Sequence, residues 1–478
     1  APRLQHAHEY MDTPPYDGVL VSRAIIGGAG TPGAKYSQQQ RNRLYSVGIR
    51  QFLNCPPQLK TMGDSGAFTF SRLGIPPLPP ADVVAFYDTL AFDYGVSVDH
   101  LVAEKRHRFD DDRVRPNSVT AKAEKSLENA LEFLRVCRTT CADFTPVAAV
   151  QGWSPRSLAR YAQKLADAGY EWIGLGGLVG QPIEMVYDCV AEVKAAVPQA
   201  TRLHVFGLSP SHVAHVTGLG IDSFDSSSPM LRAVKDSTKN YFLSTGAYAA
   251  LRIPKVVDSP RQRLPADQIE HAAALEAVAL SAIRKFSQGS ISVDDALASV
   301  LNYESFVFPE RNSFDDYHAT LEAKPWKDCT CRPCRELGID VIIHRGMNRN
   351  KRRGFHNLQV LYSELIDMRT HGQKLRVPCI RAIQGEMPVY SFVVNGKQIQ
   401  RFASVSRARR DASAQLAGYQ RPEVSEHIEE IANYLTKHTA FLPNSIVIAF
   451  RGGIDFSVTT PFSATVALGH LDIDVRDD

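Results

Sequence analysis

The sequence of 478 residues predicts an α/β protein built on a TIM (β/α)₈ barrel, followed by a cysteine-bearing subdomain and a small α+β domain. The first observation is that short β-rich runs alternate with amphipathic stretches of helical length between residues 17 and 228. Such alternation is typical of a parallel sheet. The second is the number of units, because seven strand–helix units in this length favour a barrel over an open doubly wound sheet.

Each predicted element follows from its own pattern. The strands are short, rich in β-formers and followed by turn residues, and we expect them at 17–22, 60–66, 94–100, 145–152, 171–178, 202–208 and 220–227. The helices have apolar residues spaced three and four apart, and we expect them at 80–92, 118–137, 154–169, 182–197 and 265–288. A charged segment, 101–117, separates the third strand from the next helix, and either a substrate-facing or a solvated loop suits it.

The domain boundaries follow from where this alternation stops. We expect a barrel over 1–290, a cysteine-bearing subdomain with a closing helix over 291–370, and a separate α+β segment over 371–478 that ends just after a strand. The last segment is expected to contain strands at 376–385, 444–450 and 464–473, a strand-like stretch over 389–405 with a hairpin turn at Asn395-Gly396, and a helix at 422–438.

Composition limits the class of protein. Hydrophobic residues make up 44% and charged residues 22%, which suits a globular chain with a large core. The net charge is only +3, so nucleic-acid binding must depend on local basic patches. No apolar run reaches the roughly 20 residues of a membrane span, and the first residues lack a signal-peptide pattern. We therefore expect a cytoplasmic protein with no membrane partner.

Three of the eight cysteines, at 329, 331 and 334, form a C-x-C-x₂-C pattern that indicates a metal site. Thiolates in one tight loop can converge on a tetrahedral ion such as zinc. The expected fourth ligand is His356, with His344 as the nearer rival. Four protein ligands leave no open position for water, so we predict one structural zinc per chain.

Several motifs resemble the tRNA-guanine transglycosylase superfamily over residues 15–370. They are MGDSGAF (62–68), VQG (150–152), GLGGLVG (174–180), GIDSFDSSSP (220–229), and CTCRPC (329–334) with FHNL (355–358). The chain departs from the family pattern at Ala67, at Gln181 and in the serines at 226–228, and its spacing from the third cysteine to the histidine is shorter.

The resemblance implies base exchange at a nucleotide and a role for each matching residue. Asp225 would be the nucleophile that attacks C1′, with Asp222 as the nearest competitor, and Asp64 would move protons to and from the bases. The substrate-binding residues that the motifs imply are Ser65, Asp99, Gln151, Gly176, Gly177, Leu178 and Phe206. Taken singly, Asp99 and Gln151 also fit ordinary turn positions.

The segments 15–27, 62–68 and 93–100 most resemble the DNA-acting branch of the superfamily, the DpdA proteins. That resemblance implies exchange of guanine in DNA for 7-cyano-7-deazaguanine (preQ0), with tRNA as the alternative polymer and an inactive nucleic-acid-binding paralogue as a further alternative. The tail from about Arg376 resembles the start of a DndB/DGQHR-type domain, as in the DpdB partner of the same pathway. A DpdB-like ATPase or nuclease partner or fused domain is implied, although the residues present support neither activity.

A basic cluster beside the cysteine loop is expected to contact phosphates. Its members are Arg345, Arg349, Lys351, Arg352 and Arg353. A run of charge is more often only a solvated face. The expected partners are therefore DNA, or alternatively tRNA, and a 7-deazaguanine base, and a homodimer is compatible with the sequence.

Overall fold

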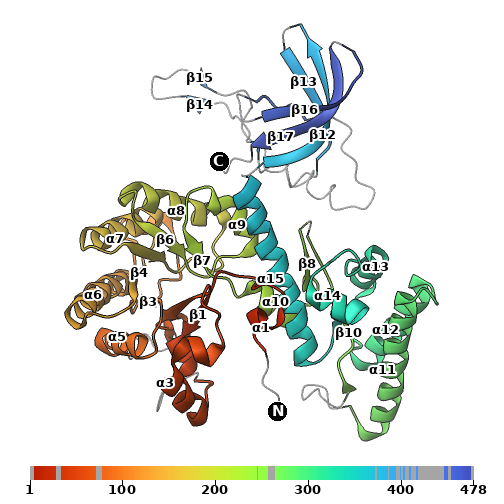
Figure 1. The fold of residues 1–478 in the computed structure, drawn as a ribbon, viewed down its shortest axis with the longest axis horizontal. Helices are drawn as coiled ribbons and strands as arrows, with labels where there is room; N and C mark the ends of the chain where they lie inside the picture. The colour runs from red at the N-terminus through yellow and green to blue at the C-terminus, as the bar shows by residue number, and fades with distance from the viewer. Residues whose placement is uncertain are drawn as a thin grey trace. The chain divides into compact units, whose positions relative to one another are not determined.

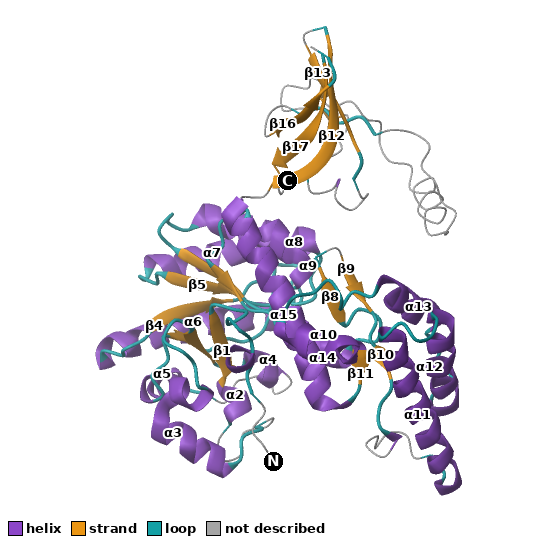
Figure 2. Cartoon of the chain, turned by 45° about the vertical axis from the view of Figure 1, so that its right-hand side comes forward, coloured by secondary structure: helices purple, strands orange, loops and turns teal. Residues whose placement is uncertain are grey.

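The computed structural model describes residues 5–27, 34–71, 78–244, 246–256, 264–371, 374–385, 387–394, 399, 402–403, 409–410, 416–417, 446–450, 454–463 and 465–474. The chain forms two compact units, Ala1–Ile366 and Asp367–Asp478. Each unit is described by itself. Figure 1 gives the course of the chain and Figure 2 its secondary structure.

The centre of the first unit is a curled parallel sheet of seven strands that are hydrogen-bonded in chain order. The strands are β1 (Gly18–Ser22), β2 (Lys60–Asp64), β3 (Tyr94–Val96), β4 (Thr145–Val150), β5 (Trp172–Leu175), β6 (Arg202–Val205) and β7 (Ser223–Phe224). All seven lie within the runs that the sequence predicted. The α/β fold of the barrel type is thereby confirmed, and the carboxyl ends of the strands meet at one edge.

Helices follow the strands and cover the outer face of the sheet (Figure 1). Helix α7 illustrates how one apolar face packs on the sheet. Its apolar residues repeat at helical spacing and are all buried, namely Leu158, Tyr161, Ala162 and Leu165. The helices of this layer are α3 (Gln38–Leu53), α5 (Pro80–Thr89), α6 (Asn117–Thr140), α7 (Pro155–Asp167), α8 (Ile183–Ala196) and α9 (Pro210–Thr217). The unit also contains α10 (Ser228–Lys235) and the one-turn helices α1 (Ala7–Tyr10), α2 (Arg23–Ile26) and α4 (Ala67–Phe70).

A long helix, α15 (Gly346–His371), bridges the two ends of the curled sheet. Its Leu361 belongs to the core beneath β4–β6, and Tyr362 Oη donates a 2.7 Å hydrogen bond to Asp17 Oδ1, just before β1. The strand β8 (Tyr241–Leu243) comes next in chain order after the seventh unit, but it pairs antiparallel with β9 (Gly246–Tyr248). Within the described residues, therefore, the parallel sheet has seven strands, and α15 contacts the residues just before β1 and just after β7.

The subdomain between β9 and α15 has a core of its own. It contains β10 (Leu251–Arg252) paired parallel with β11 (Ile343–His344), and the helices α11 (Ala266–Ser287), α12 (Val293–Val307), α13 (Phe314–Ala323) and α14 (Arg332–Leu337). The helix predicted at 265–288 is present as α11. Among the helices described in either unit, none is long and apolar enough for a membrane crossing.

The second unit contains a four-stranded antiparallel sheet in the order β13-β12-β17-β16. Its strands are β12 (Lys374–Gln384), β13 (Met387–Phe392), β16 (Ile454–Pro461) and β17 (Val466–Asp474), and a separate short pair is formed by β14 (Arg409–Arg410) and β15 (Leu416–Ala417). The strand predicted at 444–450 is wrong for residues 446–450, which have no regular secondary structure, and β16 lies a few residues later. The helix predicted at 422–438 lies outside the described residues.

Candidate active site and metal centre

The sheet register places the predicted site residues at one edge. Asp64 is the last residue of β2, Gln151 follows β4 directly, and Asp225 follows β7 directly. Three further strand ends carry predicted site residues. Asp99 comes after β3, the glycines at 176–177 and Leu178 come after β5, and Phe206 comes after β6. In barrels of this type the carboxyl edge of the sheet carries the reactive groups.

Asp64 is a carboxyl group whose surroundings favour its neutral form. Burial is the main cause, and the negative charges of Asp99 and Asp225 add to it, so that the pKa rises from 3.8 to about 7. The backbone N–H of Gly66 donates to the carboxylate and partly opposes this rise. A carboxyl group with a pKa near neutrality can give up and take back a proton, which suits a general acid/base.

Asp99, Gln151 and Ser65 form a buried polar group beside Asp64. Gln151 Nε2 donates to Asp99 Oδ2 at 2.6 Å, and Ser65 Oγ lies 3.5 Å from Asp99 Oδ1. Burial raises the pKa of Asp99 to about 6, although these hydrogen bonds and the charge of Lys105 oppose the shift. At neutral pH Asp99 is therefore mostly ionised and able to accept hydrogen bonds, whereas Asp64 is about half protonated.

The glycines after β5 are required by close packing against Gln151. A Cβ on Gly176 would lie 2.1 Å from Gln151 Nε2, and Gly177 has a positive φ of 72°. Gly177 also approaches the Lys105 ammonium, which donates to the carbonyls of Val102 at 2.9 Å and Gly152 at 2.7 Å. Leu178 is buried beside them.

Lys105 is a site residue that the sequence reading missed. It lies in the charged segment 101–117, where a lysine looks like one more solvated charge, yet it is only 6% exposed. Burial lowers its pKa to about 8, while the negative charge of Asp99 opposes that shift. Its hydrogen bonds to Val102 and Gly152 hold the segment after β3 against the loop after β4.

Asp225 is held by the turn that follows β6. The backbone N–H of Gly207 donates to Asp225 Oδ1 at 2.9 Å, and His204 Nε2 lies 3.4 Å from the same oxygen. The ring of Phe206 packs edge-on against His204 with centroids 4.5 Å apart. Asp222, the competing carboxylate, precedes β7, and its Oδ2 accepts from Leu203 N at 2.9 Å. Asp222 and Asp225 therefore lie at opposite ends of β7, and Asp222 has a local structural role.

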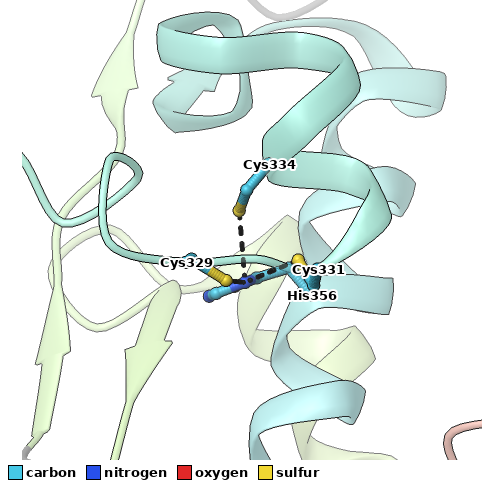
Figure 3. Close-up of side chains that lie close together, drawn as sticks. All are labelled: Cys329, Cys331, Cys334 and His356. Atoms are coloured by element: carbon cyan, nitrogen blue, oxygen red, sulfur yellow. Dashed lines mark hydrogen bonds between the residues drawn. The ribbon is translucent and has the colours of Figure 1, made fainter.

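The second site is a cluster of three thiols and one imidazole (Figure 3). The Sγ atoms of Cys329, Cys331 and Cys334 lie 3.3–3.4 Å from His356 Nδ1. All four atoms lie within 4.8 Å of one another. A tetrahedral zinc ion would separate such ligand atoms by roughly 3.5–3.8 Å, so the residues present fit that ion.

Neighbouring groups prepare these side chains for a metal. His356 Nε2 lies 2.8 Å from the carbonyl oxygen of Phe242 and donates to it, which leaves Nδ1 free as a ligand. Tyr241 stacks on the His356 ring at 4.0 Å, and its Oη lies 3.2 Å from Cys334 Sγ. The rival ligand, His344, is part of β11 and does not belong to the cluster, and burial lowers its pKa to about 3.

The basic cluster at the start of α15 is only partly available for phosphates, and the predicted phosphate contact of Arg353 is wrong. Arg353 is fully buried and donates to the carbonyl oxygens of Val341, Ile343 and Ala233, so it cannot contact a polynucleotide. Arg345 and Arg349 are paired with Glu276 and Asp340. Lys351 and Arg352 are partly exposed. Clustered charge in a sequence does not distinguish a buried arginine from an exposed one.

Residues 35–376 match the family model of queuine tRNA-ribosyltransferase, and the chain belongs to this family. It is accordingly an enzyme of the guanine transglycosylase class. Residues 377–477 match a second model, DndB, described as DNA-sulfur modification-associated. Both family resemblances seen in the sequence motifs are confirmed.

Two kinds of relative are similar to this chain. A DNA-guanine transglycosylase of Salmonella montevideo is 35% identical over 362 residues, which cover 73% of this chain and 86% of the relative. A tRNA-guanine(15) transglycosylase of Methanosphaera stadtmanae is 23% identical over 232 residues, which cover 47% of this chain and 31% of the relative. A tRNA-guanine(15) transglycosylase of Pyrobaculum aerophilum is 25% identical over 197 residues, which cover 40% of this chain and 38% of the relative.

Proposed function

We propose that this protein is a DNA-guanine transglycosylase that exchanges guanine in DNA for 7-cyano-7-deazaguanine through a covalent aspartyl-glycosyl intermediate. The observation that carries the proposal is the pair of carboxyl groups with different surroundings at one edge of the sheet. Asp64 has a pKa of about 7 because of burial and neighbouring negative charge, whereas Asp225 is 30% exposed and hydrogen-bonded to a backbone N–H. Such a pair can divide the roles of acid/base and nucleophile.

In the first half-reaction Asp225 attacks C1′ of the target nucleotide, and an ester bond forms between the carboxylate and the sugar. The bond from C1′ to the guanine nitrogen breaks, and its electron pair leaves with the base. The protonated form of Asp64 gives its proton to the departing base. In the second half-reaction the Asp64 carboxylate takes the N–H proton of the incoming base, whose nitrogen attacks C1′ and displaces Asp225.

The buried polar group beside Asp64 is suited to reading a purine-like ring. Asp99 would accept from the ring N–H groups, and Gln151 would donate its second N–H to the carbonyl oxygen of the base. The Gly177 N–H would reach the same oxygen, and Leu178 and Phe206 would form the walls. A site built from hydrogen-bond donors and acceptors rejects bases that lack the matching edge.

The choice of DNA rests on the 35% identity with the Salmonella enzyme and on the DndB segment that follows the transglycosylase segment. A base inside a duplex must leave the stack before C1′ can be attacked, so a flipped or unpaired nucleotide is expected. Zinc held by Cys329, Cys331, Cys334 and His356 would stabilise the subdomain and supply no step of the reaction.

The test is an exchange assay with three polymers. Purified protein is offered radiolabelled guanine with duplex DNA, single-stranded DNA or unmodified tRNA, then the 7-cyano base, and the products are digested for nucleoside mass analysis. We expect label and modified nucleoside in DNA. Exchange into tRNA alone would instead support the second candidate, a tRNA-guanine transglycosylase, which the similarity to the two tRNA-guanine(15) enzymes favours. Binding without exchange into any polymer would support an inactive paralogue.

A further inference from the structure

A buried histidine faces the proposed nucleophile from the neighbouring strand. His204 is in β6 and its side chain is 4% exposed, and Nε2 lies 3.4 Å from Asp225 Oδ1. This nitrogen is buried and makes no hydrogen bond within the described residues. A buried polar atom without a hydrogen bond is costly, so one aimed at a reactive carboxylate calls for an explanation.

The other ring nitrogen of His204 contacts a hydroxyl, which can donate or accept a hydrogen bond. His204 Nδ1 lies 2.8 Å from Ser223 Oγ, in the neighbouring strand β7. If the serine hydroxyl donates to Nδ1, the proton of a neutral imidazole is on Nε2 and points toward Asp225. The opposite tautomer would place a lone pair against the carboxylate, which is unfavourable. The carboxylate of Asp225 therefore favours the tautomer with the proton on Nε2, and the Ser223 hydroxyl can donate to Nδ1 in that tautomer.

The two oxygens of Asp225 are consequently in different surroundings. Oδ1 accepts from Gly207 N at 2.9 Å and faces His204, whereas Oδ2 accepts no hydrogen bond from any residue that the structure describes. The unbound oxygen is the stronger nucleophile of the two. A carboxylate held through one oxygen is also fixed in rotation, so that the other oxygen has a defined direction.

We propose that His204 is a positioning residue for Asp225, which holds Oδ1 together with Gly207 so that Oδ2 is the atom that bonds to C1′. This inference rests on the proposed role of Asp225 as the nucleophile. We expect the 3.4 Å separation to shorten into a hydrogen bond in the substrate complex, as contacts in free enzymes commonly do. In the glycosyl ester, Oδ1 becomes the carbonyl oxygen. When the incoming base attacks C1′, Oδ1 regains negative charge beside the N–H groups of Gly207 and His204.

The test compares three variants by binding, by adduct formation and by turnover. His204→Leu removes the donor, His204→Gln keeps an N–H that can reach Oδ1, and Ser223→Ala removes the hydroxyl that contacts Nδ1. We expect His204→Leu to slow formation of the denaturation-resistant adduct about 100-fold, because small errors in geometry cost about that much, with nucleic-acid affinity and thermal stability nearly unchanged. His204→Gln should recover most of the rate, and Ser223→Ala should lie between. Equal rates in the leucine variant and the wild type would overturn the inference.

A second measurement does not depend on activity and separates this inference from the proposed function. In protein labelled with ¹⁵N-histidine, the His204 signals are identified by their loss in His204→Gln. We expect Nε2 to be protonated and Nδ1 unprotonated, with the Nε2 signal shifted in Asp225→Asn. A proton on Nδ1 alone would overturn the positioning role even if exchange occurs. If the wild type forms no adduct but the Nε2 signal responds to Asp225, the proposed function fails and the contact stands.

Discussion

Gln151 Nε2 donates a 2.6 Å hydrogen bond to Asp99 Oδ2, and this bond joins the ends of β4 and β3 inside the site. Both side chains are buried, and Gln151 Oε1 accepts from Val102 N at 3.1 Å. The amide of Gln151 is thereby fixed in one orientation, with its oxygen toward the backbone and its nitrogen toward Asp99. The groups that would read a base are already in place in the free protein, which lowers the cost of ordering them.

Asp99→Asn should weaken recognition of the base more than it slows the chemistry. The substitution keeps the shape of the side chain but replaces an acceptor with a donor, so that one ring N–H of the base meets no carboxylate. We expect KM for guanine to rise by about 10–100-fold, corresponding to roughly 1–3 kcal/mol, with a smaller change in kcat. Ser65→Ala removes only the 3.5 Å contact with Asp99 and should raise KM less than Asp99→Asn does. An unchanged KM in Asp99→Asn would exclude Asp99 as a base contact.

Asp225→Asn should abolish the covalent adduct while leaving fold and nucleic-acid binding intact, because only the attacking carboxylate is lost. Asp222→Asn is the matched control, since Asp222 lies at the opposite end of β7 and accepts from Leu203 N. The control should keep adduct formation and lose some thermal stability. Denaturing gels with labelled DNA measure the adduct, and thermal denaturation measures the stability. An adduct that persists in Asp225→Asn would place the nucleophile elsewhere.

Asp64 should make stability and activity depend on pH in a defined direction. Its pKa is about 7 in the folded protein, raised first by burial and then by Asp99 and Asp225, against 3.8 ordinarily. The folded state therefore binds this proton more tightly than the unfolded state, and the resulting stabilisation is complete below about pH 4 and is lost as the pH rises through 7.

Asp64→Asn should accordingly be more stable than the wild type at pH 8.5, by on the order of 3 kcal/mol, and no more stable at pH 4. Thermal denaturation at the two pH values measures this. The same variant should lose exchange activity, because no proton can be passed between bases. Asp99→Asn removes one of the neighbouring charges and should lower the pKa of Asp64, which moves the pH profile of exchange to lower pH. A stability difference independent of pH would contradict the assignment.

The strands and the positions of Asp64, Gln151 and Asp225 at their ends could be predicted, because a short β-rich run followed by polar or turn residues can be recognised in the local sequence. Lys105 and His204 could not, since their importance comes from burial against residues distant in sequence, such as Gly152 and Asp225. The prediction that Arg353 contacts phosphates was wrong for the same reason, because the burial of this side chain depends on residues distant in sequence. The antiparallel pairing of β8 was also hidden, because a three-residue strand does not show in its sequence which neighbour it pairs with.

The metal centre should contain one zinc per chain, and His356→Ala should lose it. His344→Ala should retain it, because His344 is in β11 and outside the cluster. Metal analysis should return about one equivalent in the wild type and in the control. Removal of the metal should lower the melting temperature of the subdomain, whose core includes Cys334 and Tyr241, since binding of the ion contributes to folding. Full zinc in His356→Ala would show that another residue is the fourth ligand.

The basic residues of α15 should separate into structural and surface roles when each is replaced by alanine. Arg353→Ala leaves three buried carbonyl oxygens without their donor and creates a cavity, so we expect a loss of about 3 kcal/mol or more in the free energy of unfolding. Lys351→Ala should leave the melting temperature nearly unchanged because this side chain is partly exposed.

The same two variants differ in their expected DNA binding. If Lys351 contacts a phosphate, Lys351→Ala should weaken binding uniformly across sequences and reduce the slope of log K against log salt by about 1. Lys285→Ala, on the exposed side of α11, removes one positive charge elsewhere and is the matched control. Arg353→Ala, measured at a temperature where it is folded, should keep the wild-type slope. The assignment would be contradicted if the slope fell in the folded Arg353→Ala variant and stayed at the wild-type value in Lys351→Ala. Arg353, and not Lys351, would then contribute to phosphate binding.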